Sequence, residues 1–181
     1  MSLNFDERIL CAGHGGQGIM SMGKVLTYAG LTAGYNATWL PSYGAEVRGG
    51  TAYSMIRMNG GYIANPVVRI PGSCIIMNQP SLDKFAKKVK KGGVLLFDSS
   101  LNPDCIKRKD LTIKTAAFKD IALNLGNIKV ANMVALGSFA KLKTFLSLKS
   151  LEEAVKVFFK NKQHLIDLNI EALKKGHCVK F

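Results

Sequence analysis

The chain is 181 residues long, 48% of its residues are apolar, and its formal net charge is +13 at pH 7. Such a chain is long and apolar enough for one compact domain, residues 1–181, which excludes an intrinsically disordered protein. No apolar run approaches the roughly 18 residues of a membrane span, and residues 1–8 lack the basic start and apolar centre of a signal peptide, so we expect a cytoplasmic protein with no membrane partner.

The first predicted unit is a strand, a glycine loop and a helix. Residues 7–12 form the expected strand and residues 17–33 the expected helix. Between them, Gly13, Gly15 and Gly18 have the spacing G-x-G-x-x-G in the strand-to-helix context that this motif requires. Glycines let the backbone turn tightly and approach a ligand, and a helix N-terminus presents free N–H groups to an anion. A tight turn without a ligand is the alternative.

An antiparallel element is expected next. A short strand at residues 37–40 should stop at Pro41, and residues 51–58 alternate in polarity as a strand does. The sequence Asn59-Gly60-Gly61 is typical of a hairpin turn that returns through residues 62–64.

The second half predicts strands and then helices. Two continuous apolar runs, residues 73–78 and 94–98, are typical of strands buried on both faces, and residues 112–115 form a third strand. The expected helices span residues 80–91, 118–125, 132–145, 151–159 and 162–175, with Gly176 as the final stop. The fold class is therefore α/β: a Rossmann-like three-layer domain with a mainly parallel sheet, a β-hairpin insertion after the second strand and a helical C-terminus.

The glycine loop departs from two familiar nucleotide motifs. A dinucleotide site normally has Asp or Glu at the end of the second strand to bind the ribose, yet residues 38–42 contain no acid. Ile19 stands where a P-loop requires Lys. The loop therefore favours a phosphate-type ligand over NAD, although an independent NAD-dependent enzyme stays an alternative.

A second glycine-containing loop follows the second strand. Tyr43, Glu46 and Arg48 lie in it, at the sheet edge where we also expect the glycine loop. Arg48 could bind a phosphate or a carboxylate, and Glu46 could accept a proton or bond a partner subunit. The alternative is a Glu–Arg pair that only braces the turn.

Other polar residues form no complete catalytic set. His14 could touch a ligand, but a single His without a carboxylate or thiol partner is not a catalytic pair, and Asp98 with its two following serines also suits an ordinary turn. The four cysteines are scattered without a C-x-x-C pair, so we expect buried or free thiols and no metal site. The lysine excess suits nucleic acid, a phosphate-rich cofactor or an acidic protein, or is simply a solvated helix face.

The two loops together resemble the gamma subunit of 2-oxoacid:ferredoxin oxidoreductases. The resemblance rests on Gly13-His14-Gly15-Gly16-Gln17-Gly18 and on residues 42–51, and it extends to residues 63–66, 132–137 and 169–176. The chain looks closest to the 2-oxoglutarate branch, with an indolepyruvate or pyruvate oxidoreductase subunit as the alternative within the family. An independent nucleotide-binding protein and a nucleic-acid-binding protein are alternatives from other classes.

The resemblance implies a shared enzyme. In that family a 2-oxoacid and coenzyme A become acyl-CoA and CO2 while electrons pass to ferredoxin. Thiamine diphosphate and iron–sulfur clusters are held by other subunits, so the implied partners are alpha, beta and ferredoxin-like delta subunits and ferredoxin, with no specific nucleic acid. A homodimer of the isolated chain is also plausible. By resemblance, no catalytic residue lies in this chain. A pyrophosphate such as that of coenzyme A, or the shared active site, would face Gly13, Gly15, Gly16, Gln17 and Gly18. The junction with the thiamine-binding subunits would be lined by Tyr43, Glu46 and Arg48.

Overall fold

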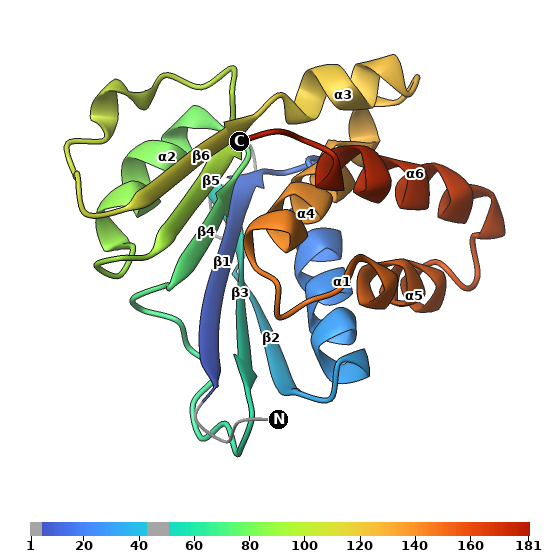
Figure 1. Cartoon of the computed structure of the whole chain (residues 1–181), viewed down its shortest axis with the longest axis horizontal. Helices are drawn as coiled ribbons and strands as arrows, with labels where there is room; N and C mark the ends of the chain where they lie inside the picture. The colour runs from blue at the N-terminus through green and yellow to red at the C-terminus, as the bar shows by residue number, and fades with distance from the viewer. Residues whose placement is uncertain (1–4, 43–50) are drawn as a thin grey trace.

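A mixed β-sheet forms the centre of the computed structural model, which describes residues 5–42 and 51–181 (Figure 1). Six strands lie in these residues, in the spatial order β2-β3-β1-β4-β5-β6. Strands β1, β4, β5 and β6 run parallel, and β3 is antiparallel to both of its neighbours, β1 and β2. The strands are β1 (Asp6–His14), β2 (Asn36–Ser42), β3 (Thr51–Asn59), β4 (Ser73–Ile76), β5 (Val94–Asp98) and β6 (Thr112–Ala116).

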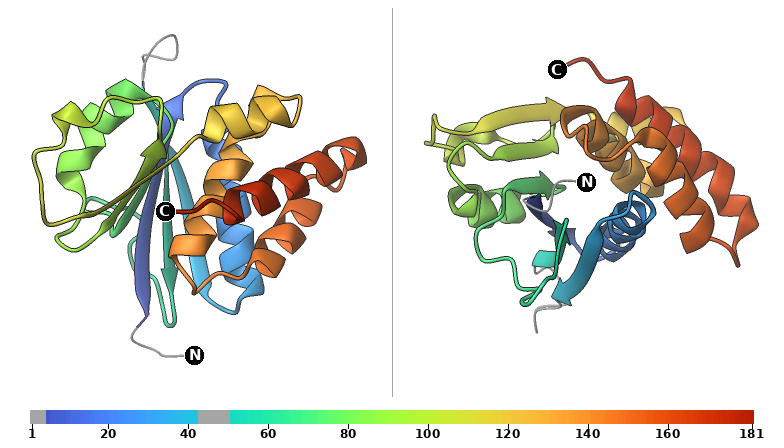
Figure 2. Two further views of the ribbon diagram at one scale, coloured as in Figure 1. Left: turned by 45° about the horizontal axis from the view of Figure 1, so that its top comes forward. Right: turned by 60° about the horizontal axis from the view of Figure 1, so that its bottom comes forward.

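Helices cover both faces of the sheet unequally. Most of them gather on one face, and α2 lies on the other (Figure 2). The helices are α1 (Ile19–Thr32), α2 (Gln79–Phe85), α3 (Phe118–Asn124), α4 (Ala131–Leu142), α5 (Leu148–Phe158) and α6 (Ile166–His177). None of the helices in the described part of the chain has the length and apolar character needed to cross a bilayer.

Strand β1 shows why the core has two halves. Ile9 and Cys11 pack into the larger cluster under α1 and α4, whereas Leu10 and Ala12 pack into the smaller cluster under α2. Successive side chains of a strand point to opposite faces, so a strand covered on both faces must be apolar throughout. All residues of β4 and β5 are buried, which confirms the expectation from their continuous apolar runs.

The antiparallel hairpin is present, but its turn is not where the sequence predicts it. Strand β3 pairs with β2 on one side and with β1 on the other, so no free side of β3 is left for residues 62–64, which form no strand. The Asn59 side chain accepts the N–H of Gly61 over 2.7 Å and starts a connection to β4 instead. The predicted hairpin return was therefore wrong because both edges of β3 are already occupied.

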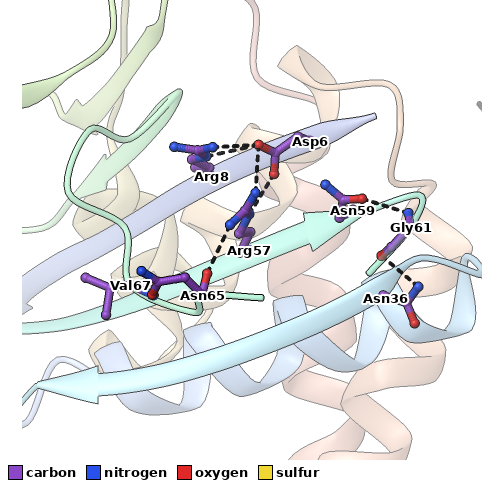
Figure 3. A network of polar contacts seen from close by, with 8 residues as sticks. All are labelled: Asp6, Arg8, Asn36, Arg57, Asn59, Gly61, Asn65 and Val67. Carbon is purple, nitrogen blue, oxygen red and sulfur yellow. Dashed lines mark hydrogen bonds and ion pairs between the residues drawn. The ribbon is translucent and has the colours of Figure 1, made fainter. Parts of the chain in front are cut away.

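A charged network fixes the end of this antiparallel pair (Figure 3). Arg8 and Arg57 lie directly opposite each other in the β1–β3 register. The carboxylate of Asp6 accepts hydrogen bonds from both guanidinium groups, at 2.8 to 3.2 Å. Arg57 also donates to the carbonyl of Asn65 over 3.0 Å. The single negative charge of Asp6 offsets part of the repulsion between the two arginines, and the bond from Arg57 to Asn65 holds the connection after β3 against the sheet.

Several predicted boundaries also moved, including the ends of α4, α5 and α6 by up to four residues. Strand β2 continues through Pro41, which an edge strand tolerates because its outer side needs no N–H donor. Helix α2 ends at Phe85 and is followed by a short 3-10 turn, Ala86–Lys88. Val89 is then extended and buried, and the chain turns at Gly92, whose φ is 73°. Gly176 lies inside α6 and not after it.

Gly176 has a packing role in place of the predicted stop. A Cβ atom on Gly176 would lie 2.0 Å from the carbonyl oxygen of Val134, and one on Gly137 would lie 2.0 Å from that of Leu173. The two glycines therefore allow the backbones of α4 and α6 to touch.

Candidate functional site

The glycine loop connects β1 to α1 at the carboxyl edge of the parallel strands, where open α/β sheets bind ligands. Gly16 and Gly18 have φ values of 91° and 69°, in the left-handed region that favours glycine. Gly18 is the N-cap of α1, and among the described residues no side chain caps this helix and no acid lies in its first turn. The N-terminus of α1 thus keeps the electrostatic character that favours an anion.

Two glycines of the motif serve packing. A Cβ atom on Gly13 would lie 2.5 Å from Gln17 Oε1 and 2.8 Å from Ile19 Cδ1. A Cβ atom on Gly18 would lie 2.3 Å from Nδ2 of Asn132, whose amide donates to the Gly18 carbonyl over 3.2 Å. Both positions exclude a side chain because the protein itself fills the space.

Gln17 holds the loop in place through both ends of its amide. Its Oε1 accepts the backbone N–H of His14 over 2.9 Å, and its Nε2 donates to the carbonyl of Met77 over 3.0 Å. The side chain therefore joins the ends of β1 and β4. Its polar groups are already bonded to protein, which makes Gln17 a positioning residue.

The remaining glycines face outward. Gly15 and Gly16 are exposed, and a Cβ atom on Gly16 would meet nothing within 4 Å among the described residues. Beside them lies a pocket of about 250 Å³, here called the loop pocket; its lining includes His14, Gly16, Gln17, Met77, Lys119 and Lys129. A site for a whole cofactor is usually ~300–1,000 Å³. The loop pocket is therefore the right size for part of a ligand, such as a phosphate group.

Two lysines of the loop pocket were not predicted from the sequence as site residues. Lys119 stands three residues after the end of β6, so the rule that ligands bind at the carboxyl edge could have indicated it. Lys129 lies in a short 3-10 turn before α4, and no sequence signal distinguishes it from other lysines. Both bring positive charge to the outward-facing glycines.

Asp98 anchors one of these lysines. Its buried carboxylate, at the carboxyl end of β5, accepts the backbone N–H groups of Ser100 and Lys119, each over 3.1 Å. The Ser100 hydroxyl also donates to it. The Lys119 ammonium lies 3.0 Å from the Ser100 hydroxyl oxygen and 3.8 Å from the carboxylate. Asp98 thus fixes both the backbone and the side chain of Lys119.

His14 is an exposed residue of the loop-pocket lining. Its Nδ1 is 2.7 Å from the carbonyl oxygen of Gly15, a contact that requires the proton on Nδ1. In the neutral ring Nε2 then carries no hydrogen, so it cannot donate a hydrogen bond to an anion.

The second predicted loop lies outside the described residues, and with it Tyr43, Glu46 and Arg48. Its two flanking strand ends are described. Ser42 pairs with Tyr53 in the β2–β3 register, and Thr51 pairs with His14 in the β1–β3 register. Both attachment points of the loop are therefore at the same sheet edge as the glycine loop.

The cysteines of this chain do not suit a cluster. Cys11 and Cys74 are buried in the two different halves of the core, and burial raises the pKa of both thiols. Cys105 and Cys178 are exposed, and all four are free thiols. Within residues 5–42 and 51–181, no three His, Cys, Asp or Glu side chains come together as metal ligands would.

The chain matches one known protein family over almost its whole length. The family model for pyruvate ferredoxin/flavodoxin oxidoreductase matches residues 8–178. The chain belongs to this family. It is 36% identical over 172 residues to the ketoisovalerate oxidoreductase subunit VorA of Methanothermobacter marburgensis, covering 94% of this chain but 36% of VorA. It is also 34% identical over 152 residues to the 2-oxoglutarate synthase subunit KorC of Methanocaldococcus jannaschii, covering 82% of this chain and 81% of KorC.

A solved oxidoreductase of this kind contains the same fold. The chain is similar to 2-oxoglutarate:ferredoxin oxidoreductase from Magnetococcus marinus with 2-oxoglutarate, coenzyme A and succinyl-CoA bound, with a TM-score of 0.85 and 26% identity. The match covers 95% of this chain and 30% of that one. The chain therefore spans about a third of the length of VorA and of the Magnetococcus protein, and most of KorC.

Proposed function

We propose that this chain is the gamma component of a multi-subunit 2-oxoacid:ferredoxin oxidoreductase. The carrying observation is the loop pocket, where two lysines meet Gly16 at one sheet edge, two residues before the uncapped N-terminus of α1. The described lining of the loop pocket contains no Ser, Thr or Cys that could serve as a nucleophile. In this proposal the chain supplies binding and closure, and alpha, beta and delta partners supply the rest.

The proposed overall reaction breaks the C1–C2 bond of a 2-oxoacid. C1 leaves as CO2, the acyl carbon forms a bond to the sulfur of coenzyme A, the thiol proton is released, and two electrons pass to ferredoxin. Thiamine diphosphate, when bound by partner subunits, stabilises the acyl carbanion equivalent, and their iron–sulfur clusters carry the electrons. The four cysteines of this chain are free thiols scattered over the fold.

Coenzyme A is the ligand we assign to the loop pocket. Its pyrophosphate carries the negative charge that Lys119, Lys129 and the N-terminus of α1 favour. Gly15 and Gly16 allow a phosphate to approach the backbone. The small pocket volume supports a site that other subunits complete. Tyr43, Glu46 and Arg48 are proposed to line that junction, because their loop is attached at the same sheet edge.

Two substrate branches have support. The 2-oxoglutarate branch is favoured by the resemblance and by the KorC relative, whereas VorA, at slightly higher identity, is named for ketoisovalerate. These substrates differ in a second carboxylate against an isopropyl group, so the deciding contacts are electrostatic or apolar and belong to the assembled active site. A panel of 2-oxoacids, ranked by kcat/KM with the assembled complex, decides between them.

An independent NAD-dependent enzyme has less support. Strand β3 lies between β1 and β2, so the residue after β2 is one strand farther from the glycine loop than in a dinucleotide fold. Calorimetric titration of the isolated chain with NAD, NADP and coenzyme A separates the alternatives. Submicromolar NAD affinity would overturn the proposal.

Co-expression is the test of the proposal as a whole. We expect the tagged chain to co-purify with thiamine-binding alpha and beta subunits, and we expect the complex to reduce ferredoxin only when both a 2-oxoacid and coenzyme A are present. Failure to associate with any thiamine-binding partner would reject a subunit role.

A further inference from the structure

A basic groove crosses the face of the sheet that α2 covers. Its floor contains Tyr53, Met55 and Phe85, and its volume is about 610 Å³. One wall is the connection between β3 and β4, and the other is the chain after α2. Five cations rim the groove: Arg69, Lys87, Lys88, Lys90 and Lys91. Its described lining contains no acid and no residue of the loop pocket.

The rim cations are exposed, and the nearby carboxylates are already bonded. Asp6 binds Arg8 and Arg57, Glu7 binds Lys143, and Asp110 binds Arg108. Asp110 also interacts with Lys91. The rim cations still outnumber the carboxylates around them, and like charges in such an excess repel one another. This repulsion is relieved when a negatively charged partner binds.

Apolar side chains accompany the charge. Val67 and Ile70 are 41% and 59% exposed on the wall of the groove. The Lys88 ammonium lies 5.4 Å from the centroid of the Phe85 ring, and the Lys84 ammonium lies 5.8 Å from that of Tyr53. A solvated lysine face needs no such apolar floor and wall, whereas a protein interface typically has an apolar centre and a charged rim.

We propose that the basic groove is a docking surface for a carboxylate-rich segment of a partner subunit that also carries apolar side chains. This inference rests on the proposed function, in which the chain works inside a larger assembly. Carboxylates bind the five rim cations, and apolar side chains cover Val67 and Ile70.

The groove suits a protein better than a nucleic acid. Single-stranded nucleic acid requires open aromatic faces on which bases stack, yet Phe85 is 3% exposed and cations lie over the rings of Phe85 and Tyr53. Binding of a nucleic-acid duplex relies mainly on contacts to phosphates, and these do not require an apolar floor.

The test uses the co-expressed complex. Lysine amines are acetylated in the complex and in the isolated chain, and the modified positions are quantified by mass spectrometry. We expect Lys87, Lys88, Lys90 and Lys91 to be protected in the complex, with zero-length carbodiimide cross-links to Asp or Glu of a partner. Lys156 and Lys160, exposed on and after α5, should be labelled equally in both samples.

A pair of charge reversals completes the test. We expect Lys87→Glu with Lys88→Glu to weaken association with the partner at least tenfold, whereas Lys156→Glu with Lys160→Glu has the same charge change and leaves it unaltered. Circular dichroism checks that both variants are folded. Equal labelling of the groove lysines in complex and isolated chain, or unchanged association of the reversal variant, would refute the docking surface while leaving the subunit role intact.

Two other outcomes would also reject the inference. If no thiamine-binding partner associates with the chain, the proposed function and the docking surface fail together. If the groove lysines are protected by a 20-base-pair DNA duplex but by no partner subunit, the groove is a nucleic-acid face and the inference is wrong.

Discussion

The side-chain amide of Gln17 donates to the backbone carbonyl of Met77 over 3.0 Å, while its oxygen accepts the N–H of His14. One side chain thus joins the carboxyl ends of two neighbouring parallel strands, β1 and β4. The shape of the glycine loop depends on this link as well as on its glycines.

Replacing the Gln17 amide should loosen the loop. Gln17→Glu keeps the acceptor for His14 but turns the donor to Met77 into a repelling oxygen, so we expect a loss of about 2 kcal/mol in the free energy of unfolding. Hydrogen exchange should accelerate at residues 13–18. Gln163→Glu, at an exposed position, is the control and should change stability by less than about 0.5 kcal/mol. Unchanged exchange in Gln17→Glu would show that the glycines alone maintain the loop.

Lys119 should contribute to anion binding at the loop pocket. We expect Lys119→Ala to weaken pyrophosphate or coenzyme A binding about tenfold, because a charge-assisted contact is lost. Asp98→Asn should weaken binding too, since Asp98 positions Lys119, and should also lower the melting temperature. Calorimetry and thermal unfolding measure the two effects, and the exposed Lys160→Ala is the control. Equal affinity in Lys119→Ala would remove this lysine from the site.

The contact between α4 and α6 should tolerate no Cβ atom. Gly176→Ala would place a methyl group 2.0 Å from the Val134 carbonyl oxygen, and we expect a destabilisation of about 3 kcal/mol as the helices separate. The matched control is Gly30→Ala in α1, where the new Cβ meets the flexible end of Met58 at 2.9 Å. Chemical denaturation of both variants checks this, and similar midpoints would contradict the proposed backbone contact.

Acid should weaken the network at the end of β1 and β3. Burial favours the neutral form of Asp6, but hydrogen bonds from Arg57 and Arg8 outweigh this and lower its pKa below the usual 3.8. A carboxylate with a lowered pKa stabilises the fold above its unfolded-state pKa, and this contribution disappears as the pH falls through the folded-state value. Asp6→Asn should therefore melt below the wild type at pH 7, and the difference should shrink toward pH 3. A difference independent of pH would show that the charge is unimportant.

Arg48 should matter for turnover and not for folding. We expect Arg48→Ala to lower kcat/KM of the assembled complex at least tenfold, because a forked contact to a phosphate or carboxylate is lost. Arg48→Lys, which keeps the charge without the fork, should recover part of the rate. Circular dichroism should show an unchanged fold, and an unchanged rate would remove Arg48 from the shared site.

Local patterns in the sequence determined most of the elements and the position of the loop. The doubly apolar runs of β4 and β5, the periodic apolar residues of α4 and the spacing of Gly13, Gly15 and Gly18 each follow from interactions within a few residues. The same reasoning favours a phosphate-type ligand over NAD at this loop, since the missing acid after β2 is visible in the chain itself.

Only the tertiary structure decided which residues meet across the sheet. The hairpin partner of β3 depends on which strand edges are free, and the role of Gly176 depends on the approach of α4. Lys119 and Lys129 reach the loop pocket from positions more than 100 residues after the glycine loop. Such contacts depend on chain topology and close packing, which no local pattern contains. The sequence by itself therefore located the glycine loop. The folded chain showed that Gly13, Gln17 and Gly18 pack within the protein, that Gly15 and Gly16 are exposed, and that two distant lysines line the loop pocket.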